Sequence, residues 1–178
     1  GTASLELDGT GDFVSIETVE DFGFGTANFA VEAWIYPTST TGTSTIFDFR
    51  TGSDADEAPR VYQTGGVLKF ASANVEHLSG GSLSLNTWHH VALARYNGTT
   101  RLYLDGSSVT GAGGDTDNRN YGNTKPLNIG SNYGTVGGDF FTGKIDEVRV
   151  SHGTARFTSN FTPPSAEYGT DVNTVLLI

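Results

Sequence analysis

Short apolar runs, each ended by a turn-forming dipeptide, most restrict what this chain can fold into. The runs His89–Tyr96 and Thr100–Leu104 are joined by Asn97-Gly98, and Asp105-Gly106 follows the second run. Asn-Gly and Asp-Gly favour turns with positive φ, whose twist matches that of a β-hairpin. The spacing predicts a meander, and the uninterrupted apolar segment 91–94 is typical of a central strand covered on both faces.

The rest of the chain repeats this pattern and lacks the 3.6-residue apolar period of a long helix. Further strands are expected at Ser4–Leu7, Phe13–Ile16, Phe29–Tyr36, Thr45–Arg50, Arg60–Gln63, Val67–Ala71, Ser107–Thr110, Leu127–Gly130, Gly143–Val150 and Thr174–Ile178. One helical turn is expected at Thr154–Phe157. Short strands at this spacing predict an all-β sandwich or barrel, with residues 1–178 as a single domain.

Composition excludes several functional classes. The chain has no cysteine, so disulfides, zinc–thiolate sites and thiol catalysis are excluded. Acidic residues outnumber basic ones by 20 to 10, and the resulting charge of −10 argues against nucleic acid and anionic membranes as partners. No stretch approaches 18 apolar residues, so no segment is expected to insert into a membrane.

Four segments in a fixed order carry a family resemblance. They are Ser4–Val14, Phe29–Ile35, Thr87–Leu93 with Leu102–Gly106, and Gly143–Val150, which reads Gly-Lys-Ile-Asp-Glu-Val-Arg-Val. Together they resemble laminin G-like domains of the concanavalin A-like lectin and glucanase fold. The resemblance implies a two-sheet antiparallel β-sandwich, a jelly roll, that binds ligands on one sheet face or on its rim loops.

The last part of the chain is similar to segments of phage tail-fibre and other virion-surface proteins. The similar stretches are Ala155–Pro164 and Asn173–Leu177. This likeness implies an extracellular location on a virion or cell surface. The partner would then be a glycan or a neighbouring surface protein, within a larger oligomeric assembly.

The residues do not predict an enzyme. Glycoside hydrolases on this fold place Glu-x-Asp-x-x-Glu on one strand, so that two carboxylates flank the sugar bond. Here Glu6-Leu7-Asp8 is the only Glu-x-Asp, and Gly11 stands where the second Glu belongs. His89 and His90 are adjacent on a strand and point to opposite faces, so they cannot hold one metal together.

Two polar, Gly-rich loops are the expected ligand site, because each offers amides, carboxylates and a tyrosine ring to a sugar. The candidate ligand contacts are Asp117, Asn118, Asn120, Tyr121, Asn132 and Tyr133. The alternative is that these tyrosines fold back over the rim of the sandwich. Trp34 and Trp88 lie within strand patterns and are interpreted as core or sheet-face packing.

The family resemblance also implies a structural Ca²⁺ in many relatives. It would be held by Asp146, with carbonyls near Asp8 and Gly25, since Ca²⁺ prefers oxygen ligands. The alternative is that Asp146 pairs with Arg149 or with a backbone amide. The loop at 115–118 is a second candidate calcium site. The alternative is that it is a plain solvated loop.

The leading hypothesis is a non-catalytic module that recognises glycans, carried on a larger surface or virion protein. The alternative is a structural or assembly module, such as a capsid decoration or fibre segment, which the apolar last strand favours. A glycoside hydrolase is the third hypothesis, and it would need paired carboxylates in an open groove.

Overall fold

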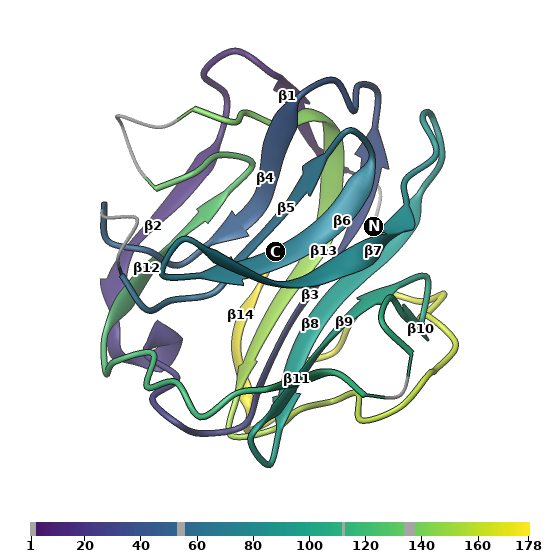
Figure 1. The fold of residues 1–178 in the computed structure, drawn as a ribbon. Helices are drawn as coiled ribbons and strands as arrows, with labels where there is room; N and C mark the ends of the chain where they lie inside the picture. The colour runs from purple at the N-terminus through teal and green to yellow at the C-terminus, as the bar shows by residue number, and fades with distance from the viewer. Residues whose placement is uncertain (1–2, 53–55, 112, 134–137) are drawn as a thin grey trace.

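Two antiparallel sheets lie face to face in the computed structural model, which describes residues 3–52, 56–111, 113–133 and 138–178 (Figure 1). The predicted all-β, two-sheet antiparallel jelly roll is therefore confirmed. The face of each sheet that packs against the other sheet is called its inner face, and the opposite one its outer face.

Sheet A has eight strands, in the spatial order β1-β13-β3-β8-β9-β10, with β14 beside β13 and β11 beside β9. Their bounds are β1 (Leu5–Asp8), β3 (Phe29–Pro37), β8 (His89–Tyr96), β9 (Thr99–Leu104), β10 (Ser107–Ser108), β11 (Asp115–Thr116), β13 (Thr142–His152) and β14 (Thr174–Leu177). The expected central strand is β8, which lies between β3 and β9 and is buried from His89 to Arg95. The expected last strand is β14, which pairs with β13.

Sheet B has six strands, in the spatial order β2-β12-β4-β5-β6-β7. Their bounds are β2 (Val14–Val19), β4 (Thr43–Asp48), β5 (Arg60–Thr64), β6 (Val67–Ser72), β7 (Val75–Ser82) and β12 (Lys125–Ile129). A 3-10 turn, η1 (Glu20–Phe22), follows β2. Within the described residues, no helix combines the length and the apolar character that crossing a membrane requires.

The hairpin turns form because the residues at their tips accept positive φ. Asn97 and Gly98 have φ of 47° and 71°, and Asp105 and Gly106 have 50° and 76°, as primed turns require. Ala73 and Asn74 make a further such turn, with φ of 47° and 62°. That turn leads into β7, which the sequence did not reveal, because Ala-Asn is a weaker turn signal than Asn-Gly.

The core fills the space between the two inner faces. Along β3 the residues Phe29, Val31, Ala33 and Ile35 alternate toward it and are all fully buried. Strands of sheet B contribute aromatic and aliphatic side chains such as Phe70 to the same cluster. Burial of this size supplies the main stabilising free energy of the fold.

A long irregular segment, residues 153–170, crosses the outer face of sheet A and is called the C-terminal strap. In Figure 1 it is the yellow-green segment beside β9 and β10. The rings of Phe157 and Phe161 stack at 3.8 Å and contact Tyr103 of β9. The Phe161 amide donates to the carbonyl of Gly106 at 2.9 Å, in a close approach that a Cβ at that position would block.

The helical turn predicted at Thr154–Phe157 is wrong, because the strap has no helical hydrogen-bond pattern there. Ala155 is buried against the sheet, and Phe157 is drawn onto Phe161. Contacts with sheet A therefore set the backbone of this segment, and they override the local helix propensity.

Candidate functional site

The predicted ligand residues Asp117 and Tyr121 lie inside the protein. Asp117 accepts hydrogen bonds from the Thr100 hydroxyl at 2.5 Å and from the Tyr121 hydroxyl at 2.7 Å. The Tyr121 ring is fully buried against Phe29 and the guanidinium of Arg95. Burial and the Asp117 carboxylate raise the pKa of Tyr121 above its usual range. Both side chains hold their loop to the sandwich, and neither reaches the surface where a ligand would meet it.

Asn118 and Asn120 of the same loop are exposed. The Asn120 side-chain oxygen accepts from the Gly122 amide at 3.0 Å and so shapes the turn. Because Tyr121 points inward, the loop lacks the aromatic face that a sugar ring would stack on. The inward position of Tyr121 matches the alternative given in the sequence analysis, in which the tyrosine folds back over the sandwich.

Asn132 and Tyr133 lie instead on the outer face of sheet B. The Tyr133 ring lies 4.7 Å from the Arg50 guanidinium, and its amide donates to Asp48 at 3.0 Å. The Asn132 amide group donates to Asp139 at 3.2 Å. The six predicted contacts thus divide between two regions and do not form one site. Residues 134–137 of this second loop lie outside the described residues.

The three residues expected to hold calcium are spread along β13. Asp8 pairs with Thr142 at one end of this strand, and Asp146 lies near its middle. Gly25 lies beyond the other end, where the ring of its neighbour Phe24 contacts His152. An eleven-residue strand spans about 30 Å, so these oxygens cannot converge on one ion.

A protein cation already binds the carbonyl of Gly25. Arg95 donates to the carbonyls of Gly25 at 2.7 Å, Ala27 at 2.9 Å and Arg119 at 2.9 Å. Within the described ranges, no three acidic or histidine side chains gather as a metal site would need. The expected residues therefore do not fit a shared calcium site, and calcium binding stays a prediction.

An arginine also binds the carboxylates of the second candidate calcium loop. Arg119 contacts Asp115 at 2.5 Å and Asp117 at 3.0 Å, and its guanidinium also contacts the ring of His77. These carboxylates therefore have a cationic partner within the chain. The alternative to a calcium site was a plain solvated loop. The structure differs from that alternative as well, because ion pairs with Arg119 hold the loop in place.

The outer face of sheet A carries a hollow that sequence reasoning missed, called the tryptophan hollow. It has a volume of about 330 Å³ and is lined by Trp34, Trp88, Asp146, Glu147 and the strap residues 164–167. Trp34 of β3 pairs across the sheet with Asp146 of β13 on one side and with His90 of β8 on the other. Neighbouring strands therefore bring together aromatic and acidic side chains from distant parts of the sequence.

Trp88 is the more accessible of the two tryptophans in this hollow. Trp88 is 39% exposed, and its ring packs against the Tyr36 ring with centroids 5.5 Å apart. Trp34 is half-buried, with its ring edge-on to His90 at 5.4 Å. The interpretation of Trp34 as sheet-face packing fits this contact, whereas Trp88 presents its ring to solvent. The signal in the sequence was the position of Trp88 just before the apolar run of β8.

A β-bulge in β13 brings two consecutive acids to the hollow. The register shifts between Asp146 and Arg149, and Glu147 at the bulge has φ of +52°. On a regular strand adjacent side chains point to opposite faces, so Asp146 and Glu147 could not line one hollow without the bulge. A non-glycine residue at positive φ costs roughly 1–3 kcal/mol and is common at ligand sites.

A buried polar network lies beside the hollow and fixes its wall. Glu32 accepts from Arg149 at 2.6 Å, and His90 Nε2 lies 3.1 Å from Glu32 and 2.8 Å from the Tyr168 hydroxyl. The Tyr168 amide donates to Glu147 at 2.9 Å, which links strap and bulge. Burial and the Glu32 carboxylate raise the pKa of Tyr168 above its usual range. The network holds the strap in place against sheet A.

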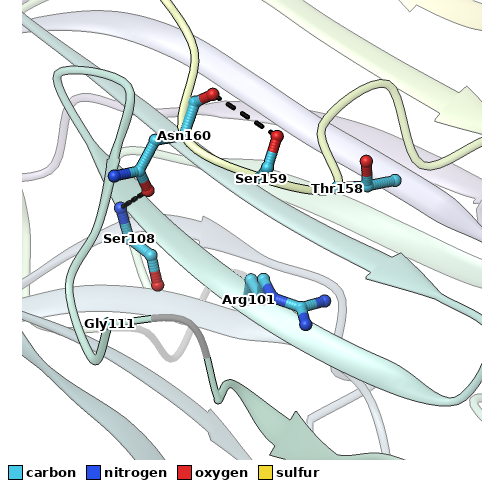
Figure 2. Close-up of a pocket in the computed structure, with 6 residues that line it drawn as sticks. All are labelled: Arg101, Ser108, Gly111, Thr158, Ser159 and Asn160. Atoms are coloured by element: carbon cyan, nitrogen blue, oxygen red, sulfur yellow. Dashed lines mark hydrogen bonds between the residues drawn. The ribbon is translucent and has the colours of Figure 1, made fainter.

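A second depression, called the polar hollow, has a volume of about 380 Å³. Figure 2 shows the residues that line it, which are Arg101 of β9, Ser108 and Gly111, and the strap residues Thr158, Ser159 and Asn160. Asn160 fixes the turn at Ser108, because its side-chain oxygen accepts from the Ser108 amide at 3.0 Å. In the described part of its lining there is no aromatic ring, so the tryptophan hollow is the better candidate for a sugar.

Comparison with known proteins identifies the family and supports the fold. The sequence model described as the concanavalin A-like lectin/glucanases superfamily matches residues 8–156. No curated protein matches the chain. A proposed carbohydrate binding protein from Bacteroides ovatus superposes with a TM-score of 0.64 at 23% identity, over 98% of this chain and 52% of that one. The chain thus spans about half the length of that protein.

Two further solved structures share the fold. A heptameric SAP-like pentraxin from Limulus polyphemus has a TM-score of 0.63 at 18% identity, over 86% of this chain and 76% of that one. Domain 4 of an extracellular arabinanase from Geobacillus stearothermophilus, in complex with arabinotriose, has a TM-score of 0.52 at 20% identity. That match covers 74% of this chain and 63% of the other. At these identities the likeness shows the fold alone.

Proposed function

Because the chain belongs to the concanavalin A-like lectin/glucanases superfamily, we propose that it is a non-catalytic carbohydrate-binding module whose sugar binds in the tryptophan hollow. The observation that carries the proposal is the exposed indole of Trp88 beside Trp34 and the carboxylates of Asp146 and Glu147. Aromatic faces bind the C–H groups of a sugar ring, and carboxylates accept hydrogen bonds from its hydroxyls.

The size and position of the hollow suit a short glycan segment. Its volume of about 330 Å³ lies at the lower end of the range for small-ligand sites, roughly 300–1,000 Å³. Strands β3 and β13 provide Trp34, Asp146 and Glu147, Trp88 immediately precedes β8, and the strap provides residues 164–167. A site on strands is more precisely positioned than one on loops.

Two of the solved structures add support. The Bacteroides protein is described as a proposed carbohydrate binding protein, and the arabinanase domain was solved with arabinotriose. We extend carbohydrate binding and an extracellular location to this chain on that basis. This chain and the two solved structures share the fold. The case for the tryptophan hollow as the binding site rests on the contacts within this chain alone.

Replacing the exposed indole tests the proposal directly. We expect Trp88→Ala to weaken binding of the best glycan from an array at least about tenfold, equivalent to about 1.4 kcal/mol, because the stacking face is lost. Isothermal titration calorimetry measures this. Tyr96→Ala is the matched control, since Tyr96 is a 44% exposed aromatic at the far end of β8, the strand that Trp88 immediately precedes. Equal affinity of the wild type and Trp88→Ala would contradict the proposed site.

The arrangement of the carboxylates suits binding without catalysis. Hydrolysis needs two carboxyl groups about 5–10 Å apart on opposite sides of the sugar bond. Asp146 and Glu147 are neighbours on one strand. The Asp146 carboxylate accepts a hydrogen bond from the Glu147 amide, and the Glu147 carboxylate accepts one from the Tyr168 amide. Incubation with oligosaccharides should therefore release no new reducing ends, and their appearance would favour the hydrolase hypothesis.

An assembly module is the second candidate function. β14 lies at an edge of sheet A with β13 as its partner in the described part of the chain, and Val172 nearby is 99% exposed. Such an edge can pair with another chain. A defined oligomer by light scattering, together with a silent glycan array, would favour this candidate and the virion or tail-fibre setting proposed with it.

A further inference from the structure

A row of side chains borders the tryptophan hollow on the outer face of sheet A. Strands β1, β13, β3 and β8 are consecutive neighbours in this sheet. Glu6 of β1 pairs with Lys144 of β13, and Lys144 pairs with Tyr36 of β3. The register of β3 and β8 brings Tyr36 opposite Trp88, and their ring centroids are 5.5 Å apart. These four residues are called the outer row, and Trp88 belongs both to the row and to the hollow.

Strand alternation puts the whole row on one face. Leu7, Ile35 and Ile145 each lie next to a member of the row along their strands, and all three belong to the core between the sheets. Because adjacent side chains on a strand point to opposite faces, the row points outward. Trp88 lines the hollow on that same outer face. The row therefore forms one surface that crosses sheet A from β8 to β1.

The strap contacts a different part of this face. Phe161 contacts the rings of His90 and Tyr103, and the Tyr168 hydroxyl lies 2.8 Å from His90 Nε2. His90 comes two residues after Trp88, so these contacts fall one row further along the strands. Every member of the outer row is exposed or half-buried. The row is therefore accessible to a ligand that extends from the hollow.

The outer row offers groups that suit consecutive sugar units. Trp88 and Tyr36 present aromatic rings, on which the C–H groups of sugars pack. The Lys144 ammonium group donates hydrogen bonds and the Glu6 carboxylate accepts them, and sugar hydroxyls can do both. The two rings are inclined by 56°, so two sugars stacked on them must be rotated relative to each other. The single bonds of a glycosidic linkage permit such a rotation.

The spacing of the row sets the length of the ligand. Neighbouring strands lie about 4.8 Å apart, which is close to the length of one sugar unit in an extended chain. From Trp88 to Glu6 the row crosses three such intervals and spans about 14 Å. The row ends at β1, which is the last strand in the order of the sheet. A chain of about three or four sugar units fits this length.

We propose that the protein binds a linear oligosaccharide of at least three sugar units, which lies along the outer row and crosses the strands of sheet A. One unit stacks on Trp88 in the tryptophan hollow, the next packs on Tyr36, and the following units hydrogen-bond to Lys144 and Glu6. This inference rests on the proposed carbohydrate-binding function, and it narrows the ligand to extended glycan chains.

A ladder of chain lengths tests the proposal with the whole chain. The probes are linear arabino-oligosaccharides and xylo-oligosaccharides of one to six units, together with the same lengths of the linear glycan that gives the strongest array signal. We expect affinity in the best series to rise at least about tenfold from the disaccharide to the tetrasaccharide, and within about threefold beyond it, as added binding registers alone would give. Isothermal titration calorimetry measures each affinity.

Variants at the far end of the row test the direction of the bound chain. Lys144→Ala and Glu6→Ala should each weaken tetrasaccharide binding about fivefold, the effect of losing one hydrogen bond, and leave disaccharide binding unchanged. Lys69→Ala on β6 and Glu17→Ala on β2 are the matched controls, because they make the same changes of charge on sheet B. Circular dichroism verifies that each variant is folded.

The outcomes separate the inference from the function on which it rests. Equal affinity for disaccharide and tetrasaccharide would overturn the inference and leave the tryptophan hollow as a site for small sugars. Unchanged tetrasaccharide binding in both Lys144→Ala and Glu6→Ala would also overturn it. No binding of any glycan by the folded wild type, on the ladder and on the array, would overturn both the inference and the proposed function.

Discussion

At the scale of single residues, Arg95 has the largest structural role of any side chain described above. It is fully buried and donates to three backbone carbonyls, including that of Gly25, where a calcium ion was expected. Burial lowers the pKa of its guanidinium, while the Asp117 carboxylate acts in the opposite direction. Arginine remains charged in proteins in any case, so it can act here as a permanent cation.

Removing this cation should be costly. We expect Arg95→Met to lower the free energy of unfolding by about 3–5 kcal/mol, because carbonyls and the Asp117 carboxylate would lose their buried partner. Urea unfolding measures this. Lys69→Met is the comparison, since its ion pair with Glu76 is at the surface and is worth at most about 1 kcal/mol. Equal losses in the two variants would contradict the role given to Arg95.

At the scale of elements, the strap and the bulge in β13 shape the outer face of sheet A. Most strands of sheet A are recognisable from the sequence because alternation and turn dipeptides are local signals, whereas the short β11 lies in a segment whose polar composition does not predict a strand. The strap has no such signal, and its predicted helical turn was wrong. Its conformation follows from the stacked Phe157 and Phe161, which find their partners on β8 and β9.

Shortening one ring of this stack should affect stability and binding together. We expect Phe161→Ala to lower the free energy of unfolding by about 2 kcal/mol, less than the roughly 3–5 for a fully buried phenylalanine, because the ring is only half-buried. Glycan affinity should also fall, since residues 164–167 of the strap line the hollow. Urea unfolding and calorimetry measure both effects. With the exposed Thr158→Ala as control, a stable variant with normal binding would argue against this role of the strap.

At the scale of the whole molecule, the candidate sites lie in different regions of the sandwich. The tryptophan hollow is on the outer face of sheet A, whereas Tyr133 contacts Asp48 and Arg50 on sheet B. The expected calcium ligands lie along β13 and do not meet. The two sheets are therefore held together by the shared core, and arginine contacts tie the connecting loops to it.

Removal of calcium tests whether a bound ion stabilises the fold. We expect EGTA to leave the melting temperature unchanged, because Arg95 already binds the Gly25 carbonyl. Differential scanning calorimetry with EGTA, and with excess CaCl₂ as control, gives the result. A rise in melting temperature with calcium would reveal a site formed by other residues, because a ligand that binds only the folded state stabilises it.

The sequence by itself determined the two-sheet fold, most of the strands and the turns at Asn97-Gly98 and Asp105-Gly106. Those signals are local, because side-chain alternation and positive φ act within a few residues. Tertiary structure alone decided that Tyr121 turns inward, that Trp88 stays exposed and that Asp146 lies beside Trp34. These outcomes depend on which strands become neighbours, and strand pairing joins residues whose separation along the chain carries no local signal.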